Sequence, residues 1–139
     1  MAFKIFLDAN ILLDLTLRRS NYDKAKKVFE LVGDNKVKGY TTPSIIHILG
    51  HYITKSYDAN IAKELILTLL KDILIIDMSH ELVITALNSQ MIDIEDSLQY
   101  YSALHHKMDY FISMDKQLRK SGIPGLPVLT PDELIALFN

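Results

Sequence analysis

The sequence contains no cysteine, so this protein can form neither a disulfide framework nor a thiolate-ligated zinc site. It also lacks any apolar run of membrane-spanning length. The first residues run directly into a strand-like apolar stretch, without the basic start, long apolar region and small-residue cleavage site of an export signal. These absences favour a reducing compartment, and we expect a cytoplasmic protein.

An excess of basic charge is missing as well. The 15 Lys and Arg residues stand against 17 Asp and Glu residues, which gives a formal net charge of −2. Without a global basic field, binding to a polyanion would require local basic clusters or bridging metal ions, which disfavours a conventional DNA-binding module.

Apolar residues, by contrast, are plentiful. They make up 49% of the 139 residues, enough for one domain over residues 1–139 with a continuous core. Short β-branched runs alternate with longer helical patterns, which is typical of a parallel sheet covered by helices on both faces. We expect an α/β protein, a three-layer α/β/α sandwich with a central, mainly parallel five-stranded sheet. The expected strands cover residues 3–7, 37–41, 73–76 and 110–113, with a short one near Val128.

Helical periodicity fills the segments between these strands. Thr42 and Pro43 mark the start of one amphipathic helix. Near the C-terminus, Thr130, Pro131 and Glu133 form a capping box with proline at the first helical position. We expect the last helix to run almost to the final residue.

Aspartates follow two of the expected strands. Asp8 comes directly after the strand 3–7, and Asp115 lies just beyond the strand 110–113. Ligands of an open parallel sheet bind beyond the carboxyl ends of its strands. If these two strands are neighbours, their carboxylates converge at that edge.

A third acidic group consists of Asp93, Glu95 and Asp96, which open a helix at the same rim of the sheet. Like charges packed together destabilise one another unless a cation joins them, and hard oxygen ligands suit magnesium or manganese. Such a site indicates the phosphate chemistry that metal-dependent nucleases carry out.

Each of these acids also has a structural interpretation. Asp8 and Asp115 could each cap the helical segment that follows, and Glu95 and Asp96 would be favoured at the positive end of a helix. Their joint placement at one sheet edge favours the functional interpretation. Asp77 also follows an expected strand, but because that strand is predicted at the edge of the sheet, we leave this aspartate outside the site.

Three segments resemble the PIN-domain family, which includes the VapC-type toxins of bacterial toxin-antitoxin pairs. They are FLDANILLD at 6–14, EDSLQY at 95–100, and SMD at 113–115 followed by LTP at 129–131. The resemblance spans nearly the whole chain and implies a PIN-like fold.

The same resemblance implies that Asp8, Asp96 and Asp115 are catalytic carboxylates that bind Mg²⁺ or Mn²⁺. The supporting residues that it implies are Asn10, Ser113, Glu95 and Asp93. It further implies an endoribonuclease that hydrolyses RNA phosphodiester bonds, an antitoxin protein as partner, and a homodimer.

One region departs from the family pattern. PIN nucleases usually carry a glutamate on the helix after the second strand, whereas residues 44–52 contain no acid and His47 or Ile48 takes that place. This resembles a PIN subgroup with histidine or asparagine there, and it removes one anionic ligand. The leading alternative is therefore a PIN scaffold with weak or no catalysis that acts as an RNA- or protein-binding module.

Two other enzyme interpretations fit less well. A phosphorelay receiver would carry paired acids after its first strand, where this chain has the single Asp8. A zinc protease could present His47 and His51 from one helix, but Ile48 stands where its glutamate base would be. We instead expect His47 to support the site as a hydrogen-bond donor to phosphate or carboxylate, and His51 to be structural.

Basic residues close to the candidate ligands in the sequence are expected to contact the RNA backbone. They are Arg18, Lys116 and Arg119. Lys26 and Lys27 are interpreted as part of a solvated helix face.

Overall fold

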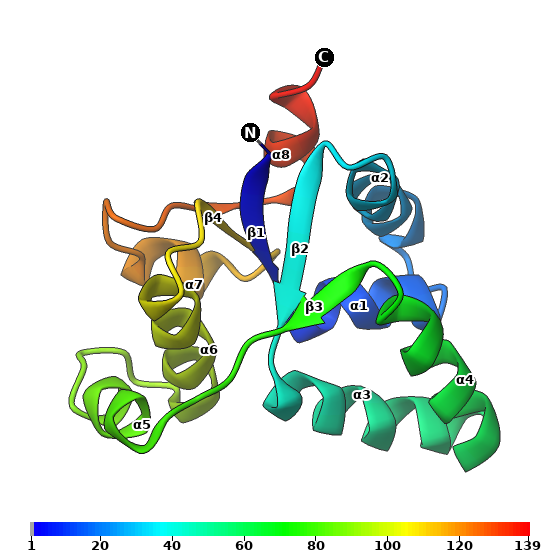
Figure 1. Ribbon diagram of the computed structural model, residues 1–139, viewed down its shortest axis with the longest axis horizontal. Helices are drawn as coiled ribbons and strands as arrows, with labels where there is room; N and C mark the ends of the chain where they lie inside the picture. The colour runs from blue at the N-terminus through cyan, green and yellow to red at the C-terminus, as the bar shows by residue number, and fades with distance from the viewer. Residues whose placement is uncertain (1) are drawn as a thin grey trace.

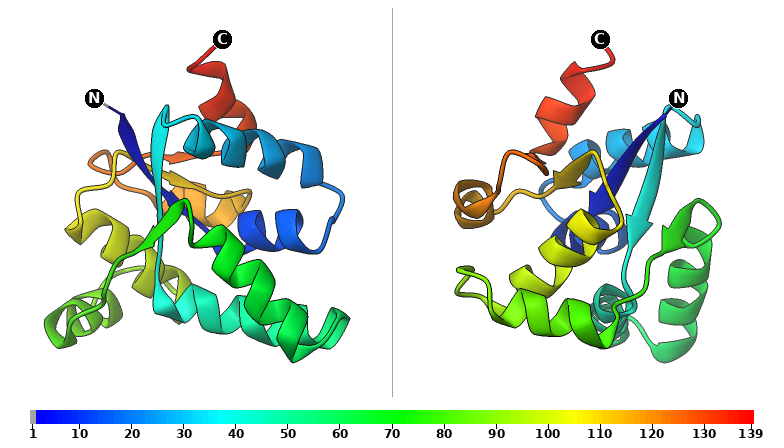
Figure 2. Two further views of the ribbon diagram at one scale, coloured as in Figure 1. Left: turned by 45° about the vertical axis from the view of Figure 1, so that its right-hand side comes forward. Right: turned by 60° about the vertical axis from the view of Figure 1, so that its left-hand side comes forward.

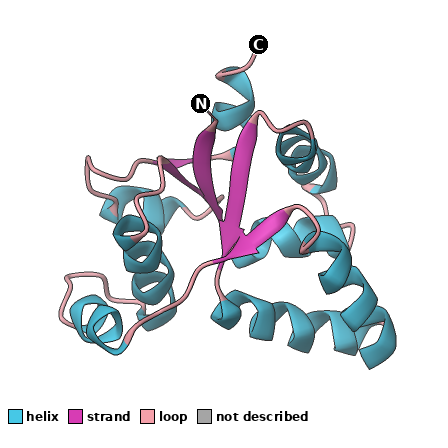
Figure 3. Cartoon of the chain, viewed as in Figure 1, coloured by secondary structure: helices cyan, strands magenta, loops and turns pink. Residues whose placement is uncertain are grey.

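The computed structural model describes residues 2–139, which form five strands and eight helices (Figure 1, Figure 3). The strands are β1 (Phe3–Leu7), β2 (Val37–Thr41), β3 (Ile73–Ile75), β4 (Tyr110–Ile112) and β5 (Val128–Leu129). The helices are α1 (Ala9–Thr16), α2 (Tyr22–Gly33), α3 (Pro43–Ser56), α4 (Ala59–Leu69), α5 (His80–Leu87), α6 (Ile94–His105), α7 (Lys116–Ser121) and α8 (Pro131–Ala136). None of these helices is long and apolar enough to cross a membrane.

The strands form one parallel sheet in the order β3-β2-β1-β4-β5. From β1 the chain moves outward to β2 and β3, then returns past β1 to β4 and β5, so the direction of winding reverses between β1 and β4. Because crossovers between parallel strands are right-handed, α1 to α4 cover one face and α5 to α7 the other (Figure 1, Figure 2). The predicted three-layer sandwich is confirmed, and such sheets bind ligands at the point of reversal.

The second half of the central strand β1 is buried on both faces, as its apolar sequence requires. Ile5, Phe6 and Leu7 of β1 are 0% exposed. The ring of Phe6 stacks on that of Phe111 in β4, with centroids 4.8 Å apart. This packing fixes β1 beside β4, and the two strands carry the candidate aspartates at their ends.

Strands β3 and β4 each end one residue earlier than predicted. The inter-strand hydrogen bonding still reaches the predicted boundary. The amide of Ile76 donates to the carbonyl of Thr41 at 2.8 Å, and the amide of Ser113 donates to the carbonyl of Leu129 at 3.0 Å. Ser113 is therefore held in the extension of the sheet.

A buried glutamine connects the two helical layers at the rim of the sheet. Gln99 of α6 is 2% exposed; its side-chain oxygen accepts from the Thr42 hydroxyl, and its amide donates to Ser44 Oγ at 2.8 Å. Thr42 also caps α3 by accepting from the amide of Ile45, with Pro43 in the first turn as predicted. These bonds hold the start of α3 against α6. The predicted capping box of α8 is likewise present.

The side chain of Tyr100 fixes α6 to the loop between α7 and β5. Its side chain is 0% exposed, its hydroxyl donates to the carbonyl of Leu126 at 2.6 Å, and the same oxygen accepts from the amide of Ile123 at 2.8 Å. These two bonds tie α6 to the loop between α7 and β5. Because Asp96 lies one turn earlier on α6, the anchor helps to set the position of its carboxylate.

Removing this hydroxyl should destabilise the protein. We expect Tyr100→Phe to lower the free energy of unfolding by about 1–3 kcal/mol, because the buried carbonyl of Leu126 and the amide of Ile123 lose their partner. Denaturant titration measures the change. Tyr101→Phe is the matched control, since no described residue hydrogen-bonds the Tyr101 hydroxyl. Equal stability of the two variants would contradict the anchoring role.

Candidate active site

The reversal between β1 and β4 brings Asp8 and Asp115 to the same edge of the sheet, as predicted. Ser113 connects them: its hydroxyl donates to Asp8 Oδ2 at 2.8 Å and accepts from the amide of Asp115 at 3.0 Å. The other oxygen of Asp8 accepts from the amide of Ala9 at 2.8 Å. Asp8 is only 8% exposed, so both of its oxygens are oriented by buried donors.

The capping interpretation of these aspartates is confirmed, and it leaves room for a second role. Asp8 is the N-cap of α1 and Asp115 that of α7. Asp115 uses one oxygen for this, because Oδ1 accepts from the amides of Gln117 at 2.8 Å and Leu118 at 3.3 Å. Within residues 2–139, no group hydrogen-bonds its Oδ2. That oxygen is available to a ligand.

The third acidic group forms the start of α6. Asp93 is the N-cap, and its Oδ1 accepts from the amide of Asp96 at 2.9 Å. Glu95 and Asp96 occupy the first helical turn. The helix therefore opens two residues before Asp96, and the capping residue within this group is Asp93.

The carboxylates lie close enough to influence one another's ionisation. Burial raises the pKa of Asp96 from 3.8 to about 7, with further contributions from the negative charges of Asp93, Asp8, Asp115 and Glu95. Burial also raises the pKa of Asp8, against the opposing hydrogen bonds from Ser113 and Ala9. The pKa of Glu95 is raised mainly by burial and then by Asp93 and Asp8. The acids thus form one electrostatic cluster.

Asp8, Asp96 and Asp115 line one cavity of about 530 Å³. Its other lining residues are Ala9, Asn10, Leu13, Arg19, His47, Ile48, His51, Tyr52 and Glu95. The predicted supports Asn10, His47 and Glu95 are thus at the cavity, whereas Ser113 lies beneath it and is 1% exposed.

Arg19, His51 and Tyr52 are cavity residues that the sequence analysis did not assign to the site. For His51, the four-residue spacing from His47 could have indicated the shared helix face.

The predicted RNA-contacting residues lie elsewhere. The guanidinium of Arg18 stands 5.2 Å from the ring centroid of Tyr22, Arg119 pairs with Glu133 at 2.8 Å, and Lys116 is exposed at the start of α7. None of the three lines the cavity.

The cation at the cavity is Arg19. Its Nε donates to Asp14 Oδ1 at 2.8 Å, and its Nη2 donates to the carbonyl and side-chain oxygens of Asn10, each at 3.2 Å. Asp14 is only 5% exposed, so the ion pair fixes the guanidinium firmly. Arg19 therefore orients Asn10 at the cavity wall.

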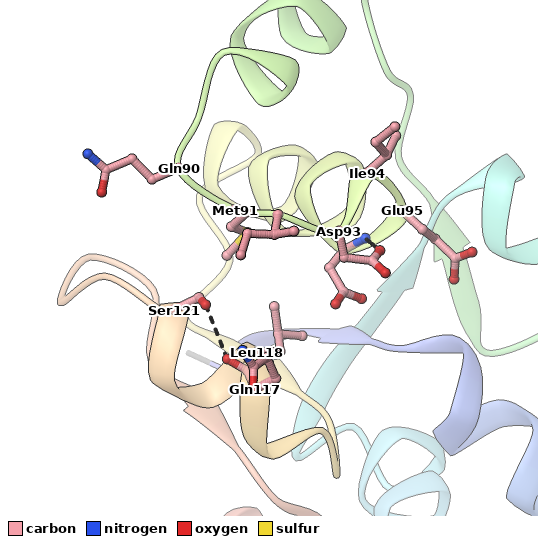
Figure 4. A pocket seen from close by; sticks show the side chains of 10 residues that line it. Gln90, Met91, Asp93, Ile94, Glu95, Gln117, Leu118 and Ser121 are labelled. Carbon is pink, nitrogen blue, oxygen red and sulfur yellow. Dashed lines mark hydrogen bonds between the residues drawn. The ribbon is translucent and has the colours of Figure 1, made fainter.

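A second cavity of about 610 Å³ adjoins the first and shares Glu95 and Asp96 with it (Figure 4). It lies between the loop preceding α6 and helix α7, and its polar side chains include Gln90 and Gln117. Glu95 and Asp96 thus lie at the boundary between the two cavities.

Asp77 lies outside this site, as expected. It follows β3 at the edge of the sheet, and its carboxylate pairs with Nε2 of His106 at 3.2 Å. The same imidazole nitrogen also lies 3.0 Å from the carbonyl oxygen of Asp77.

The donor set of the cavity suits a hard cation. It offers no thiolate. It does offer carboxylate oxygens, which are the ligands that magnesium and manganese prefer. In the conformation described for residues 2–139, no three His, Asp or Glu side chains converge on one point as ligands of a single ion. Mg²⁺ commonly uses one or two carboxylates and retains several waters, and Asp96 and Asp115 each bring to the cavity a carboxylate oxygen that no described residue hydrogen-bonds.

The PIN-domain family model matches residues 4–117, so the chain belongs to the PIN-domain family. The toxin-antitoxin pair VapBC2 from Rickettsia felis, solved with a DNA fragment from its promoter, is similar in fold: the TM-score is 0.72 at 15% identity, covering 92% of this chain and 98% of that one. VapC20 from Mycobacterium tuberculosis, described as a sarcin-ricin loop cleaving toxin, gives a TM-score of 0.69 at 11% identity, covering 87% of this chain and 97% of that one.

A toxin-antitoxin complex from Klebsiella pneumoniae gives a TM-score of 0.68 at 21% identity, covering 91% of this chain and 97% of that one. At these identities the likeness establishes a common fold. Comparison with curated proteins gives no significant match.

The acidic cluster predicts an unusual pH dependence of stability in a chelator. The folded-state pKa of Asp96, about 7, lies above its ordinary value of 3.8, so its contribution to stability is complete below about pH 4 and is lost as the pH rises through 7. We expect the melting temperature of the wild type to fall between pH 5 and 8.

Asp96→Asn should remove part of that fall and melt a few degrees above the wild type at pH 8. Thermal denaturation in EDTA across this range measures the effect, with the exposed Asp72→Asn as control. Parallel curves for wild type and Asp96→Asn would show that the carboxylates do not repel one another as described.

Proposed function

We propose that this PIN-domain protein is an endoribonuclease that hydrolyses RNA phosphodiester bonds with Mg²⁺ or Mn²⁺ bound in the cavity that Asp8, Asp96 and Asp115 line. The observation that carries this proposal is the shared cavity at the reversal between β1 and β4, where these carboxylates interact electrostatically. Nothing in the described chain neutralises that cluster as a whole, and a divalent cation with a phosphate ligand would do so.

The chain's own residues then have distinct tasks. Ser113 and the amide of Ala9 keep Asp8 oriented, and Arg19 positions Asn10 at the cavity. His47, which also lines the cavity, would donate a hydrogen bond to a phosphate oxygen. The bound ion would activate water and offset charge on the scissile phosphate.

The proposed partners follow from the structural neighbours. Two of these come from toxin-antitoxin assemblies, in each of which one chain shares this fold along nearly its full length. We propose that the protein is the toxin of such a pair, inhibited by an antitoxin and assembled as a homodimer in the cytoplasm.

A second candidate function is a PIN scaffold that binds RNA or protein without cleaving it. The observations that favour it are the absence of an acid from the wall formed by α3, where His47 stands, and the open arrangement of the candidate ligands. Cleavage and metal-binding experiments separate the two functions.

Asp8→Asn tests the catalytic proposal. We expect wild type to cleave a mixed RNA pool only with Mn²⁺ or Mg²⁺, and Asp8→Asn to lose at least about 100-fold in rate, because the buried carboxylate oriented by Ser113 is gone. Gel electrophoresis of the RNA measures cleavage, and the exposed Asp72→Asn is the control. Equal cleavage by Asp8→Asn would point to a contaminating nuclease, and Mn²⁺ binding by the wild type without cleavage would favour the scaffold.

Ser113→Ala tests the support of the metal ligands. Loss of the hydroxyl removes the donor to Asp8 and the acceptor for the amide of Asp115, so we expect Mn²⁺ affinity to fall about 10- to 100-fold. Titration calorimetry measures the affinity. Ser102→Ala is the matched control, because Ser102 is 0% exposed and its hydroxyl only donates to the carbonyl of Leu98. Equal loss in both variants would indicate a general packing effect.

A further inference from the structure

Helix α3 brings aromatic side chains to the acidic cavity, and of these the proposed hydrolysis uses only His47. His47, Ile48, His51 and Tyr52 of this helix all line the cavity. The rings of His51 and Tyr52 meet edge to face, with centroids 5.1 Å apart. Tyr52 is 49% exposed, so much of its ring is open to a ligand.

The fold itself does not explain this exposure. The buried face of α3 consists of Ile45, Leu49 and Ile53, each 0% exposed. Tyr52 lies beside that face and makes no hydrogen bond to any described residue. The half-exposed ring of Tyr52 packs against the imidazole of His51. The ring is therefore oriented before a ligand arrives and offers a surface for stacking.

The cavity lining combines two kinds of chemistry. Asp8, Asp96 and Asp115 contribute carboxylates, whereas α3 contributes imidazole, aliphatic and phenol groups. A phosphate drawn to the carboxylates through a cation would place the neighbouring nucleoside within the same 530 Å³. A nucleobase is neutral and has two π faces, so it matches an aromatic wall without requiring a basic patch.

We propose that Tyr52, supported at its edge by His51, stacks on the nucleobase next to the phosphate that lies at the carboxylates. The ligand class is single-stranded RNA with an unpaired base at this position, since a base must leave its helix to be stacked in this way. This inference rests on the proposed function in taking RNA as the ligand. It adds a specificity element on α3, the helix without an acidic ligand.

The chain offers a close control. Tyr57 is the C-cap residue of α3 and is 48% exposed, nearly the same as Tyr52, but it does not line the cavity. Alanine at either position removes a half-exposed phenol from one end of the same helix. Only Tyr52→Ala should therefore affect RNA.

The experiment measures binding separately from cleavage. Wild type, Tyr52→Ala, Tyr52→Phe and Tyr57→Ala are titrated against a short fluorescein-labelled oligouridylate in Mn²⁺ on ice, and gels confirm that the probe stays intact. A second probe has the same ribose-phosphate backbone without bases. We expect Tyr52→Ala to weaken oligouridylate binding roughly 5- to 100-fold, and Tyr52→Phe and Tyr57→Ala to bind as wild type. The abasic probe should bind all four proteins equally.

Each alternative result decides the matter. Wild-type binding by Tyr52→Ala in a protein that cleaves RNA overturns the stacking inference and leaves the ribonuclease proposal standing. Equal weakening on both probes also overturns it, because the base would then play no part. Tyr52-dependent binding without cleavage supports stacking and contradicts the ribonuclease proposal. Failure of the wild type to bind either probe overturns both.

Discussion

The structure depends on the crowding of carboxylates at the junction of β1 and β4. Asp8 is almost fully buried there, and its pKa is raised first by that burial and then by the negative charges of Asp115 and Asp93. Burying negative charges together costs free energy, and the raised pKa values of Asp8 and Asp96 express that cost. Ser113 and the helix-capping amides offset it only in part. The rim is therefore an unfavourable element of the metal-free fold that a bound cation would make favourable.

The rest of the molecule holds these charges in place. Left to repulsion alone, α6 would move away from Asp8, but Tyr100 fixes it to the loop before β5 and Gln99 fixes it to the start of α3. Both residues lie within a turn or so of Asp96, and both make their bonds in buried surroundings, where unpaired groups would be costly. The same hydrogen bonds thus stabilise the fold and keep the mutually repelling carboxylates close together.

Much of this arrangement was accessible from the sequence, because it follows from periodicity and strand order. Short β-branched runs between longer helical patterns predicted the five strands. An aspartate after each of two strands predicted that their carboxylates share one edge of the sheet. Which basic side chain lies at the cavity could not be predicted in this way, since sequence proximity does not give side-chain direction. Arg18 has a positive φ of 51°, and the turn that follows directs Arg19 toward Asn10 and the cavity. The position of Tyr52 at the cavity depends on how α3 crosses the end of the sheet, and local sequence patterns do not specify that crossing.

The missing acid on α3 is consistent with this electrostatic picture. Four carboxylates, those of Asp8, Glu95, Asp96 and Asp115, already line the cavity, and the pKa of Asp96 has risen to about 7. A further acid at the position of His47 would increase the repulsion and raise these pKa values further, so that an additional ligand would be gained partly in its protonated form. Imidazole at this position adds no negative charge. Helix α3 then adds groups without negative charge to a cavity that four carboxylates already line, so a phosphate and its neighbouring nucleoside would each meet groups of suitable chemistry.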